Sequence, residues 1–404
     1  MATLTPFRAL RPPPSGALRV AAPPYDVVST EEARALAAGN PDSFLHVSRP
    51  EIDLPPGTDE HADEVHAQGA RALADFQARG VLLRDPEPRL YVYAQRMGSH
   101  RQTGIVACAS VEEYVADRIR KHERTRADKE DDRTRHVDVL SAHDEPVFLT
   151  YRSVAALDAE VEAVKRGAPE YDLVTADGVE HRLWLAPEEA GSRIAGLFRA
   201  VPALYVADGH HRSAAAARVH ALRKGRPGEH GAFLAVVFPH DQMQILAYNR
   251  VVRDRRGRGA EALLAEIRKV LDVEPAGGPA PEAPLSFGVY AGGRWWRARV
   301  RAGTFDARDP VASLDCSICQ DQVLGPVFGI RDPRRDRDVD FVGGIRGAAE
   351  LERRVDQGGW SMAIHLFPTR IDQVMAVSDA GLAMPPKSTW FEPKLRSGLF
   401  VHPF

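Results

Sequence analysis

An aspartate, two histidines and an arginine are grouped around one glycine in the segment VADGHHRSAAAAR, which runs from Val206 to Arg218. An apolar run ends at this group, and a run of alanines follows it. The pattern predicts a strand, a tight turn at Gly209 and a helix that begins near Ser213. The first N–H groups of a helix lack intrahelical partners and carry partial positive charge. The segment is therefore typical of an anion site, although it lacks the Walker pattern of P-loops.

Several side chains of this turn can serve a phosphate. Arg212 offers a fork of N–H donors that matches phosphate oxygens, and His210 and His211 can add hydrogen bonds. Asp208 can coordinate a Mg²⁺ that travels with a nucleotide, or it can hold a histidine in one tautomer. The predicted phosphate site comprises Asp208, Gly209, His210, His211, Arg212 and Ser213.

Two other interpretations of the turn stay open. In the first, Asp208 only caps the helix and the histidines are solvated. In the second, the histidines bind a catalytic zinc ion. Adjacent histidines point in different directions, however, and no HExxH spacing occurs, so the sequence favours zinc least.

A second chemical group lies upstream, where His122 and Glu123 precede the charged segment RTRADKEDDRTRH. If this segment is a helix, Lys129 and Arg133 share one face, and His136 follows three residues later. Such a basic stripe can meet phosphates, and a carboxylate at the mouth of the helix can act as a general base on a hydroxyl. The alternative is a solvated helix held by its own salt bridges.

A third group lies close to the C-terminal end, in the segment MPPKSTWFEPKLRSGLF at residues 384–400. Chain ends usually lose their pattern, but this one is dense in prolines, aromatic residues and lysines. The segment can bring lysines and hydroxyls into a cleft. The residues predicted to do so are Lys387, Ser388, Thr389 and Lys394. The alternative is a tail that is only docked by Trp390 and Phe391.

The chain has 404 residues, a formal net charge of −3 and three cysteines. This length suggests two or three domains. The balanced charge argues against a protein that coats DNA, since nonspecific phosphate binding needs a concentrated positive surface. Cys316 and Cys319 have CxxC spacing, but no second pair completes a zinc site, so we expect them in a packed helix. With few cysteines, no membrane-spanning run and no signal peptide, we expect a soluble cytoplasmic protein.

Strands and helices mix along the whole chain without a repeat, which predicts an α/β or α+β fold. Strands are expected at LYVYA, TGIVACASV, VFLTY and ALYVAD, and AFLAVVFP and QILAYNRVV look like two strands of the same sheet. The Pro- and Gly-rich segment EPAGGPAPEAPLS is the clearest connection. We therefore divide the chain into an N-terminal α/β region (1–104), a nucleotide-binding core (105–273) and a C-terminal α+β region with a Pro/Lys-rich tail (274–404).

The motif ADGHHR, preceded by KHERT, resembles the DGHHR or DGxHR box of the ParB/sulfiredoxin-like superfamily, whose members bind nucleotides. This superfamily includes chromosome-partition CTPases, sulfiredoxin and free-serine kinases. The resemblance to the kinases covers about residues 105–250. It implies that Glu123 is the base on the substrate hydroxyl, with His122 as its neighbour. It also implies an α+β fold, in which a mixed-sheet nucleotide-binding core has N-terminal and C-terminal α/β elaborations.

Nearly the whole chain also resembles one uncharacterised family of bacteria and archaea, domain of unknown function 1015. The matching segments are PPYDVVS, KHERT, DKEDDRTRH, PVFLTY, ADGHHR and MPPKSTWFEPKLRSGL. Membership of this family does not by itself imply an activity.

Together these patterns favour a nucleotide-dependent kinase, a phosphotransferase that acts on free serine or a similar hydroxylated metabolite. The expected cofactors are ATP or ADP with Mg²⁺, and Asp208 is the expected metal ligand. One alternative is a nucleotide-binding and hydrolysing switch or regulator of the ParB type, and another is a phosphatase that acts on a small phosphoester. The sequence argues against nucleic-acid and membrane partners. It leaves the oligomeric state open, with a homo-oligomer among the options.

Overall fold

The computed structural model describes residues 2–404, and the chain folds into two compact units. Unit 1 has the bounds Met1–Met243 and Pro393–Phe404, and unit 2 has the bounds Gln244–Glu392. Both units combine helices with β-sheet, so the chain has the expected α+β fold.

The boundaries of the two units differ from those of the three predicted regions. Residues 244–273 belong to unit 2 rather than to the nucleotide-binding core, and residues 393–404 of the tail belong to unit 1. The segment EPAGGPAPEAPLS connects β15 (Leu271–Pro275) to β16 (Ser286–Ala291) within one sheet of unit 2. Its prolines and glycines therefore mark a loop inside a unit.

The main sheet of unit 1 runs in the order β6-β11-β8-β12-β5-β4-β10-β9, and β1 pairs with β5. β12 is parallel to β8 and antiparallel to β5, so the sheet is mixed. Nearly every residue of β12 is buried, which explains why AFLAVVFP is apolar throughout instead of alternating. The strands of unit 1 are β1 (Leu4–Thr5), β2 (Leu10–Arg11), β3 (Leu83–Arg84), β4 (Tyr91–Met97), β5 (His100–Ser110), β6 (Ile119–Arg120), β7 (Ala142–His143), β8 (Val147–Tyr151), β9 (Tyr171–Val174), β10 (Glu180–Leu185), β11 (Leu204–Asp208), β12 (Ala232–Pro239) and β21 (His402–Pro403).

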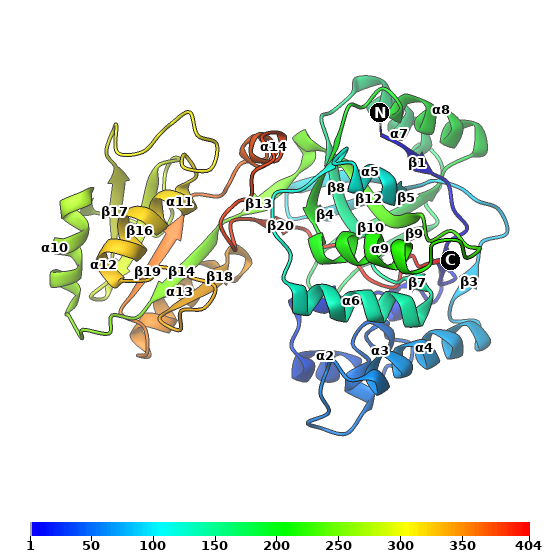
Figure 1. Cartoon of the computed structure of the whole chain (residues 1–404), viewed down its shortest axis with the longest axis horizontal. Coiled ribbons are helices and arrows are strands. Elements are labelled where there is room, and N and C mark those ends of the chain that lie inside the picture. Colours follow the sequence, from blue (N-terminus) through cyan, green and yellow to red (C-terminus); the bar gives the residue numbers. More distant parts are fainter. Residues whose placement is uncertain (1) are drawn as a thin grey trace. The chain divides into compact units, whose positions relative to one another are not determined.

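Helices surround this sheet, and α6 and α9 lie side by side (Figure 1). α2, α3 and α4 contribute to a second apolar core beside the one that the sheet buries. The helices of unit 1 are α1 (Ala17–Val20), α2 (Thr30–Ala37), α3 (Leu45–Ser48), α4 (Asp63–Ala78), α5 (Val111–Val115), α6 (Ala127–Leu140), α7 (Ala155–Val164), α8 (Glu188–Phe198) and α9 (His210–Leu222), with the short turns η1 (Tyr25–Val27), η2 (Pro50–Asp53) and η3 (His240–Gln242).

The C-terminal segment of unit 1 is packed against elements from much earlier in the chain. β21 pairs with β7, which fixes the end of the segment. Gly398 has a φ of 83°, and a Cβ at this position would lie 2.6 Å from the side chain of Phe44. Only glycine fits both the backbone conformation and this close approach. The path of the chain around Lys394 is therefore set by packing on its C-terminal side.

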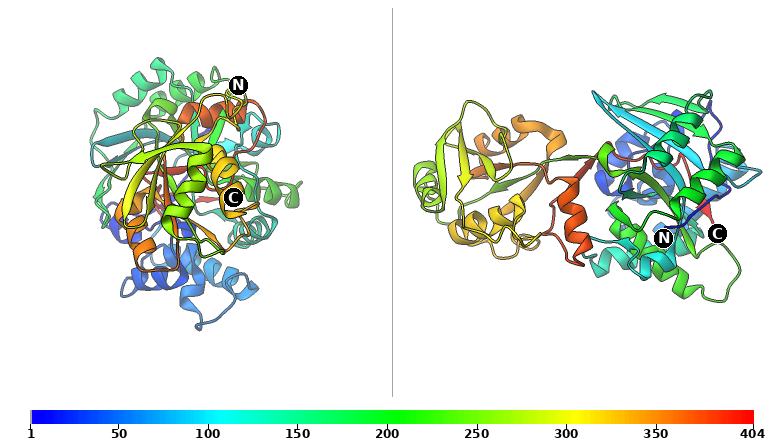
Figure 2. Two further views of the ribbon diagram at one scale, coloured as in Figure 1. Left: turned by 90° about the vertical axis from the view of Figure 1, so that its left-hand side faces the viewer. Right: turned by 90° about the horizontal axis from the view of Figure 1, so that it is seen from above.

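The main sheet of unit 2 runs in the order β15-β17-β16-β19-β14-β18. α13 packs on one face of the sheet, and α11 and α12 lie on the other, as the view from above in Figure 2 shows. The elements of unit 2 are β13 (Gln244–Leu246), β14 (Tyr248–Val252), α10 (Ala260–Val270), β15, β16, β17 (Arg294–Val300), α11 (Asp315–Cys319), the π-helical turn η4 (Gln320–Leu324), α12 (Gly325–Phe328), β18 (Val339–Gly343), η5 (Gly344–Arg346), α13 (Gly347–Asp356), β19 (Met362–Leu366), α14 (Ile371–Asp379) and β20 (Trp390–Glu392).

The expectation that AFLAVVFP and QILAYNRVV are strands of the same sheet is wrong. The first is β12 of unit 1, whereas the second supplies β13, which pairs with β20, and β14, which lies between β18 and β19. Both segments are apolar and rich in β-branched residues. These properties predict a strand, but they do not indicate which other strand it pairs with.

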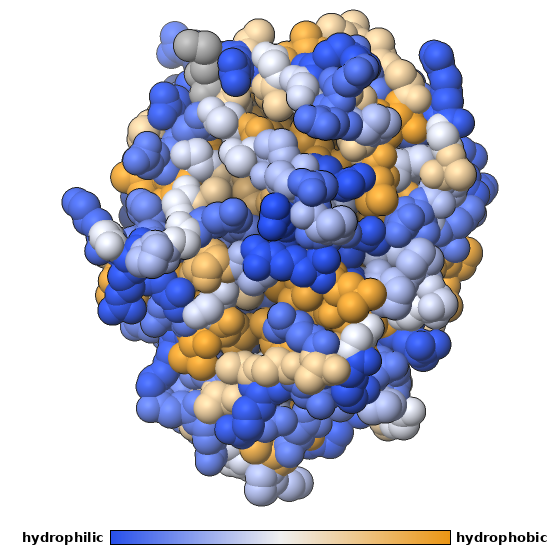
Figure 3. All heavy atoms as spheres, turned by 90° about the vertical axis from the view of Figure 1, so that its right-hand side faces the viewer, coloured by the Kyte–Doolittle hydropathy of each residue, from blue (hydrophilic) through white to orange (hydrophobic). Residues whose placement is uncertain are grey.

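Large hydrophobic side chains on the surface are dispersed. On the face shown in Figure 3, hydrophobic residues form separate patches between hydrophilic ones. The exposed residues Leu18, Val115 and Leu222 come from three different helices. Among residues 2–404, no helix has both the length and the apolar character needed to cross a membrane.

Candidate functional site

The segment with the grouped polar residues forms a strand, a turn and a helix, as predicted. β11 ends at Asp208, Gly209 takes the left-handed conformation with φ 92°, and α9 starts directly at His210. The helix begins earlier than the expected start near Ser213, because Gly209 completes the turn in a single residue. The N–H groups of the first turn of α9 therefore belong to the motif itself.

The carboxylate of Asp208 is held between cations at the start of α9. Its Oδ2 accepts a hydrogen bond from Nζ of Lys394 at 2.8 Å, and its Oδ1 accepts one from the N–H of Gly209 at 2.8 Å. Nη2 of Arg212 lies 3.9 Å from the same Oδ1. Burial opposes ionisation, but Lys394 and Arg212 hold the pKa of Asp208 well below its usual value. Asp208 is therefore ionised at neutral pH.

His122 and Glu123 lie next to the same turn. The ring of His122 meets the ring of His210 edge-on, with 4.4 Å between the centroids. Oε2 of Glu123 lies 3.9 Å from Nδ1 of His210, and the Glu123 side chain is 42% exposed. The KHERT and DGHHR motifs, which are far apart in the sequence, thus meet in unit 1.

Both of these histidines are buried, and burial keeps their rings neutral. Burial lowers the pKa of His122 to about 4. Burial, followed by the nearby His122, lowers the pKa of His210 well below its usual value. Nε2 of His210 has no hydrogen-bond partner within the described part of the chain.

The N-termini of α6 and α9 are linked by a hydrogen bond. The N–H of Arg126, the residue before α6, donates to Nε2 of His211 at 3.1 Å. In this structure the Nε2 atom of His211 is therefore occupied by its hydrogen bond to the start of α6. The positive ends of two helix dipoles adjoin at this point, which favours an anion there.

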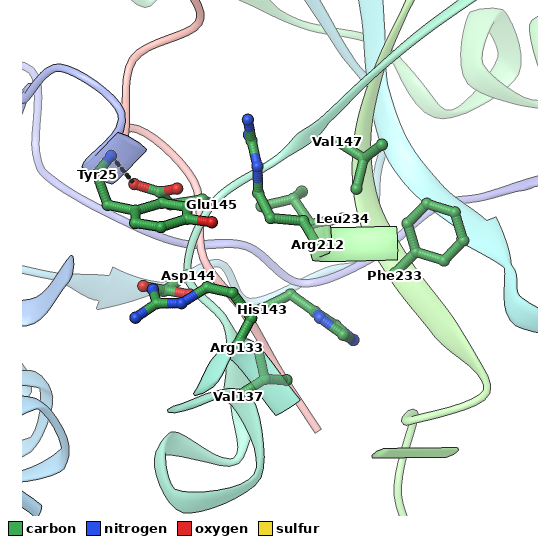
Figure 4. A pocket seen from close by; sticks show the side chains of 10 residues that line it. All are labelled: Tyr25, Arg133, Val137, His143, Asp144, Glu145, Val147, Arg212, Phe233 and Leu234. Atoms are coloured by element: carbon green, nitrogen blue, oxygen red, sulfur yellow. Dashed lines mark hydrogen bonds between the residues drawn. The ribbon is translucent and has the colours of Figure 1, made fainter. Parts of the chain in front are cut away.

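Arg212 lies in the interior instead of opening toward solvent. Its guanidinium donates to the carbonyl oxygen of Pro146, and its Nη2 lies 3.8 Å from Oδ2 of Asp26. Figure 4 shows Arg212 among the residues that line a small internal cavity, together with Tyr25 and Glu145. In this position Arg212 supports Asp208 from behind, whereas the sequence predicted that it grips phosphate itself.

Glu145 is the unusual acid of this interior network. Its Oε1 accepts hydrogen bonds from the N–H of Tyr25 at 3.0 Å and from the hydroxyl of Ser397 at 2.7 Å, while its buried Oε2 has no partner among residues 2–404. Burial raises the pKa of Glu145 to about 7, although Arg212 opposes the shift. The cavity beside it has a volume of about 10 Å³, which suits one water molecule.

The residues of the predicted basic stripe contact other side chains of the protein. The guanidinium carbon of Arg133 lies 4.2 Å from the centre of the Tyr25 ring, and its Nε donates to Asp132 at 3.0 Å. Nζ of Lys129 lies 3.9 Å from Glu60. The reason is that α6 packs between α4 and α9, so the face that presents Arg133 is buried.

The predicted residues of the C-terminal segment fall into different units. Lys394 is in unit 1 beside Asp208, whereas Lys387, Ser388 and Thr389 are in unit 2. The hydroxyl of Ser388 donates to the carbonyl oxygen of Pro385 at 2.6 Å, so it serves the local fold of unit 2.

No group of three or more His, Cys, Asp or Glu side chains in residues 2–404 is arranged to hold a metal ion. Cys316 and Cys319 are buried free thiols on α11, as expected for a packed helix. A Mg²⁺ carried by nucleotide phosphates needs only one or two protein carboxylates. Asp208 fits that requirement as a single ligand, because it is ionised and lies at the start of α9.

No role was predicted for Tyr25, Asp26, Glu145 or Ser397, which support the turn from the interior. Tyr25 and Asp26 are part of PPYDVVS, and Glu145 lies two residues before the apolar strand β8. The sequence signal for Glu145 was an acid just before a strand that is apolar throughout. Such an acid is expected to be buried, and a buried carboxyl group needs a hydrogen-bond or charge partner.

The structure resembles several solved proteins at a distant level. A free serine kinase in complex with AMP overlaps with a TM-score of 0.37 and 12% identity, covering 73% of this chain and 92% of that one. A conserved hypothetical protein from Pyrococcus furiosus has the same TM-score and identity, with 74% and 95% covered. SbnI with a C-terminal truncation, from Staphylococcus aureus, gives 0.38 and 14%, with 74% and 87% covered.

The sequence comparisons give a clear family and nothing further. No curated protein matches the chain. The sequence profile of one family, described as "Protein of unknown function (DUF1015)", matches residues 4–317. That span includes both KHERT and DGHHR and covers most of the chain, so the chain belongs to the DUF1015 family.

Proposed function

We propose that unit 1 is a nucleotide-dependent kinase that phosphorylates a small hydroxylated metabolite such as free serine. The observation that supports this proposal most is the meeting of Glu123 with the start of α9, where Oε2 lies 3.9 Å from Nδ1 of His210. A carboxylate that can receive a hydroxyl proton then stands beside a site that favours phosphate. The structural likenesses are too distant to support an activity, so the proposal depends on the contacts within unit 1.

The phosphates of the nucleotide would bind at the N-terminus of α9. Its free N–H groups and the ammonium of Lys394 supply positive charge, and Lys394 is held there by its 2.8 Å contact with Asp208. Mg²⁺ would add charge neutralisation, with Asp208 as its protein ligand. Arg212 would not contact the phosphates. Its buried guanidinium would instead hold Asp208 in place from the interior.

Glu123 would accept the proton of the substrate hydroxyl. Phosphoryl transfer depends on positioning of the reactants and on neutralisation of the phosphate charge. It also needs a group, here a carboxylate, that orients the attacking oxygen. The neutral ring of His210 next to Glu123 can share a proton with the carboxylate without adding a competing charge. His122 would position His210, since its ring packs edge-on against it.

Phosphorus NMR on the purified protein tests the proposal. ATP or ADP is supplied with Mg²⁺ and a panel of amino acids and polyols that carry hydroxyl groups. A new phosphomonoester signal that requires both the protein and one acceptor supports the kinase. Release of inorganic phosphate without any acceptor product would favour the hydrolysing switch, and failure to bind a nucleotide by calorimetry would exclude both functions.

A further inference from the structure

Arg250 of β14 is a buried cation without a carboxylate partner. Only 3% of this residue is exposed. Other buried arginines are near acids, since Nε of Arg11 lies 2.9 Å from Asp85 and Nε of Arg133 lies 3.0 Å from Asp132. Among residues 2–404, no carboxylate lies within ion-pair distance of Arg250.

The surroundings of Arg250 are aromatic rings, thiols and a single carbonyl group. Its Nη1 donates to the carbonyl oxygen of Tyr248, and its guanidinium carbon lies 4.9 Å from the centre of the Phe341 ring. Cys316 and Cys319 of α11 are near enough to interact with it electrostatically. The rest of the guanidinium fork has no acceptor within the described residues.

The two thiols do not supply the missing negative charge. Burial raises the pKa of Cys319 to about 12 and also raises that of Cys316, although Arg250 opposes both shifts. At neutral pH the thiols are therefore uncharged. In agreement, burial lowers the pKa of Arg250, whereas the pKa of Arg133 is raised because acids and Tyr25 outweigh its burial.

The segment around Ser388 lies against the same place in unit 2. The hydroxyl of Ser388 is 3.1 Å from the sulfur of Cys316, the thiol that neighbours Arg250. Lys387 has a φ of 56°, which is uncommon for a residue with a side chain, and its ammonium lies 5.6 Å from the centre of the Tyr248 ring. Arg250 and Lys387 thus lie over two neighbouring rings, Phe341 and Tyr248, whose centroids are 6.0 Å apart.

Tight packing holds this segment against the sheet. A Cβ at Gly343 of β18 would lie 2.7 Å from the ring of Trp390, so the indole sits directly on the backbone of that strand. The Trp390 ring also meets the Tyr248 ring edge-on at 5.1 Å. The positions of Ser388 and Lys387 are therefore set by the residues that follow them.

We propose that unit 2 binds a small oxyanion, a phosphate or carboxylate group of a ligand, at Arg250, with Ser388 and Lys387 beside it. An isolated buried charge is costly, and an oxyanion removes that cost by occupying the unused side of the guanidinium fork. The inference depends on contacts within unit 2 alone. It stands or falls independently of phosphoryl transfer in unit 1.

Thermal unfolding of the full-length protein, with calorimetry for the affinity, tests this site. Sodium phosphate and sodium acetate are titrated separately at constant ionic strength, with chloride as the reference. The wild type is compared with Arg250→Met and with Arg250→Lys, which retains the charge but loses the fork. We expect the oxyanion to raise the melting temperature of the wild type, and its dissociation constant to increase about tenfold or more in both variants.

Two matched variants locate the effect. Arg258→Met removes an arginine of unit 2 that is already paired, since its Nη2 lies 2.7 Å from Asp254. Lys394→Met removes the cation beside Asp208 in unit 1. Both variants should keep an Arg250-dependent response to the oxyanion.

A response to phosphate alone assigns a phosphoryl group, and a response to acetate alone assigns a carboxylate. Arg250→Met should fold, because the substitution leaves no acid without its partner. An oxyanion response that is undiminished in Arg250→Met, that disappears in Lys394→Met, or that is absent from the wild type overturns the proposal.

Discussion

Unit 1 and unit 2 each bury an arginine next to a segment that the sequence marked as chemical, but they surround it differently. Arg212 of unit 1 lies within 4 Å of both Asp26 and Asp208. Arg250 of unit 2 donates to a carbonyl group and lies over an aromatic ring, and the charges it interacts with electrostatically include no carboxylate among the described residues. The charge of Arg212 is balanced by nearby carboxylates, whereas the charge of Arg250 has no carboxylate partner among the described residues.

This difference separates two uses of a buried cation. In unit 1 the positive charge positions Asp208, which in turn holds Lys394 at the start of α9, so the arginine acts through other residues. In unit 2, no acid among residues 2–404 forms an ion pair with Arg250. The comparison therefore predicts that substitution of Arg212 lowers stability, while substitution of Arg250 weakens anion binding without a loss of stability.

The largest effect is expected at Glu123. Glu123→Gln keeps the size of the side chain but removes its ability to accept a proton, so phosphoryl transfer should fall by roughly 10²–10⁴-fold. The dissociation constant for the nucleotide should stay within about twofold. Initial rates by phosphorus NMR and binding by calorimetry measure the two quantities.

Glu112→Gln is the matched control for this experiment, since Glu112 is an exposed glutamate of α5 outside the turn. It should leave both quantities unchanged. Equal loss of transfer and of nucleotide binding in Glu123→Gln would contradict the role of Glu123 as a base.

The next largest effect contrasts the two arginines directly. Arg212→Met removes the cation from a buried network of acids and should lower the free energy of unfolding by about 3 kcal/mol. Arg250→Met removes an unpaired buried charge and should leave that free energy unchanged or raise it in chloride buffer. Denaturant unfolding of both variants measures the difference. Equal destabilisation would contradict the claim that Arg212 is paired with acids and Arg250 is not.

An effect of similar size concerns the pH dependence of stability. Glu145 has a pKa of about 7 in the folded chain against an ordinary value of 4.5, so the folded state favours its neutral form. Its contribution to stability is fully present below pH 4.5 and is lost as the pH rises through about 7. Over this window the free energy of unfolding should fall by about 3 kcal/mol.

Glu145→Gln mimics the neutral acid and isolates this contribution from other titrating groups. The variant should be more stable than the wild type at pH 8, and the difference between the two should shrink as the pH is lowered toward 4.5. Denaturant unfolding at several pH values checks this. A constant difference across the range would show that Glu145 does not titrate there.

The smallest effect is expected at Lys394. Lys394→Met removes one charged hydrogen bond at the phosphate site while the N–H groups of α9 remain. The dissociation constant for ADP should therefore increase about tenfold. Lys224→Met, at an exposed lysine after α9, should have no effect, and calorimetry compares the two variants.

Local patterns predicted the turn of unit 1 well. Gly209 after an apolar run, followed by alanines, was sufficient to indicate the strand, the turn and the helix of the motif. The resemblance to kinases implied that Glu123 is the base on the substrate hydroxyl, but no spacing in the sequence indicated that Glu123 lies near His210. These features depend on a few neighbouring residues or on the order of motifs.

The remaining features depend on contacts that no local pattern specifies. Arg133 was expected on a helix face that can meet phosphates, and it is buried because α4 packs on α6. Arg212 was expected to open toward phosphate, and it turns inward because Asp26 and Pro146 lie behind it. Within the described part of the chain, the lack of an acid paired with Arg250 is a property of tertiary packing, which a strand pattern such as YNRVV does not reveal.

Hydrogen–deuterium exchange of the full-length protein with and without ADP and Mg²⁺ tests the central claim most directly. We expect peptides covering residues 208–214 to gain the strongest protection, because the phosphates bind the first N–H groups of α9. Peptides covering residues 248–252 of unit 2 should respond to phosphate or acetate instead. Protection by ADP that is confined to other parts of unit 1, or no protection at residues 208–214, would contradict the assignment of this turn as the nucleotide site.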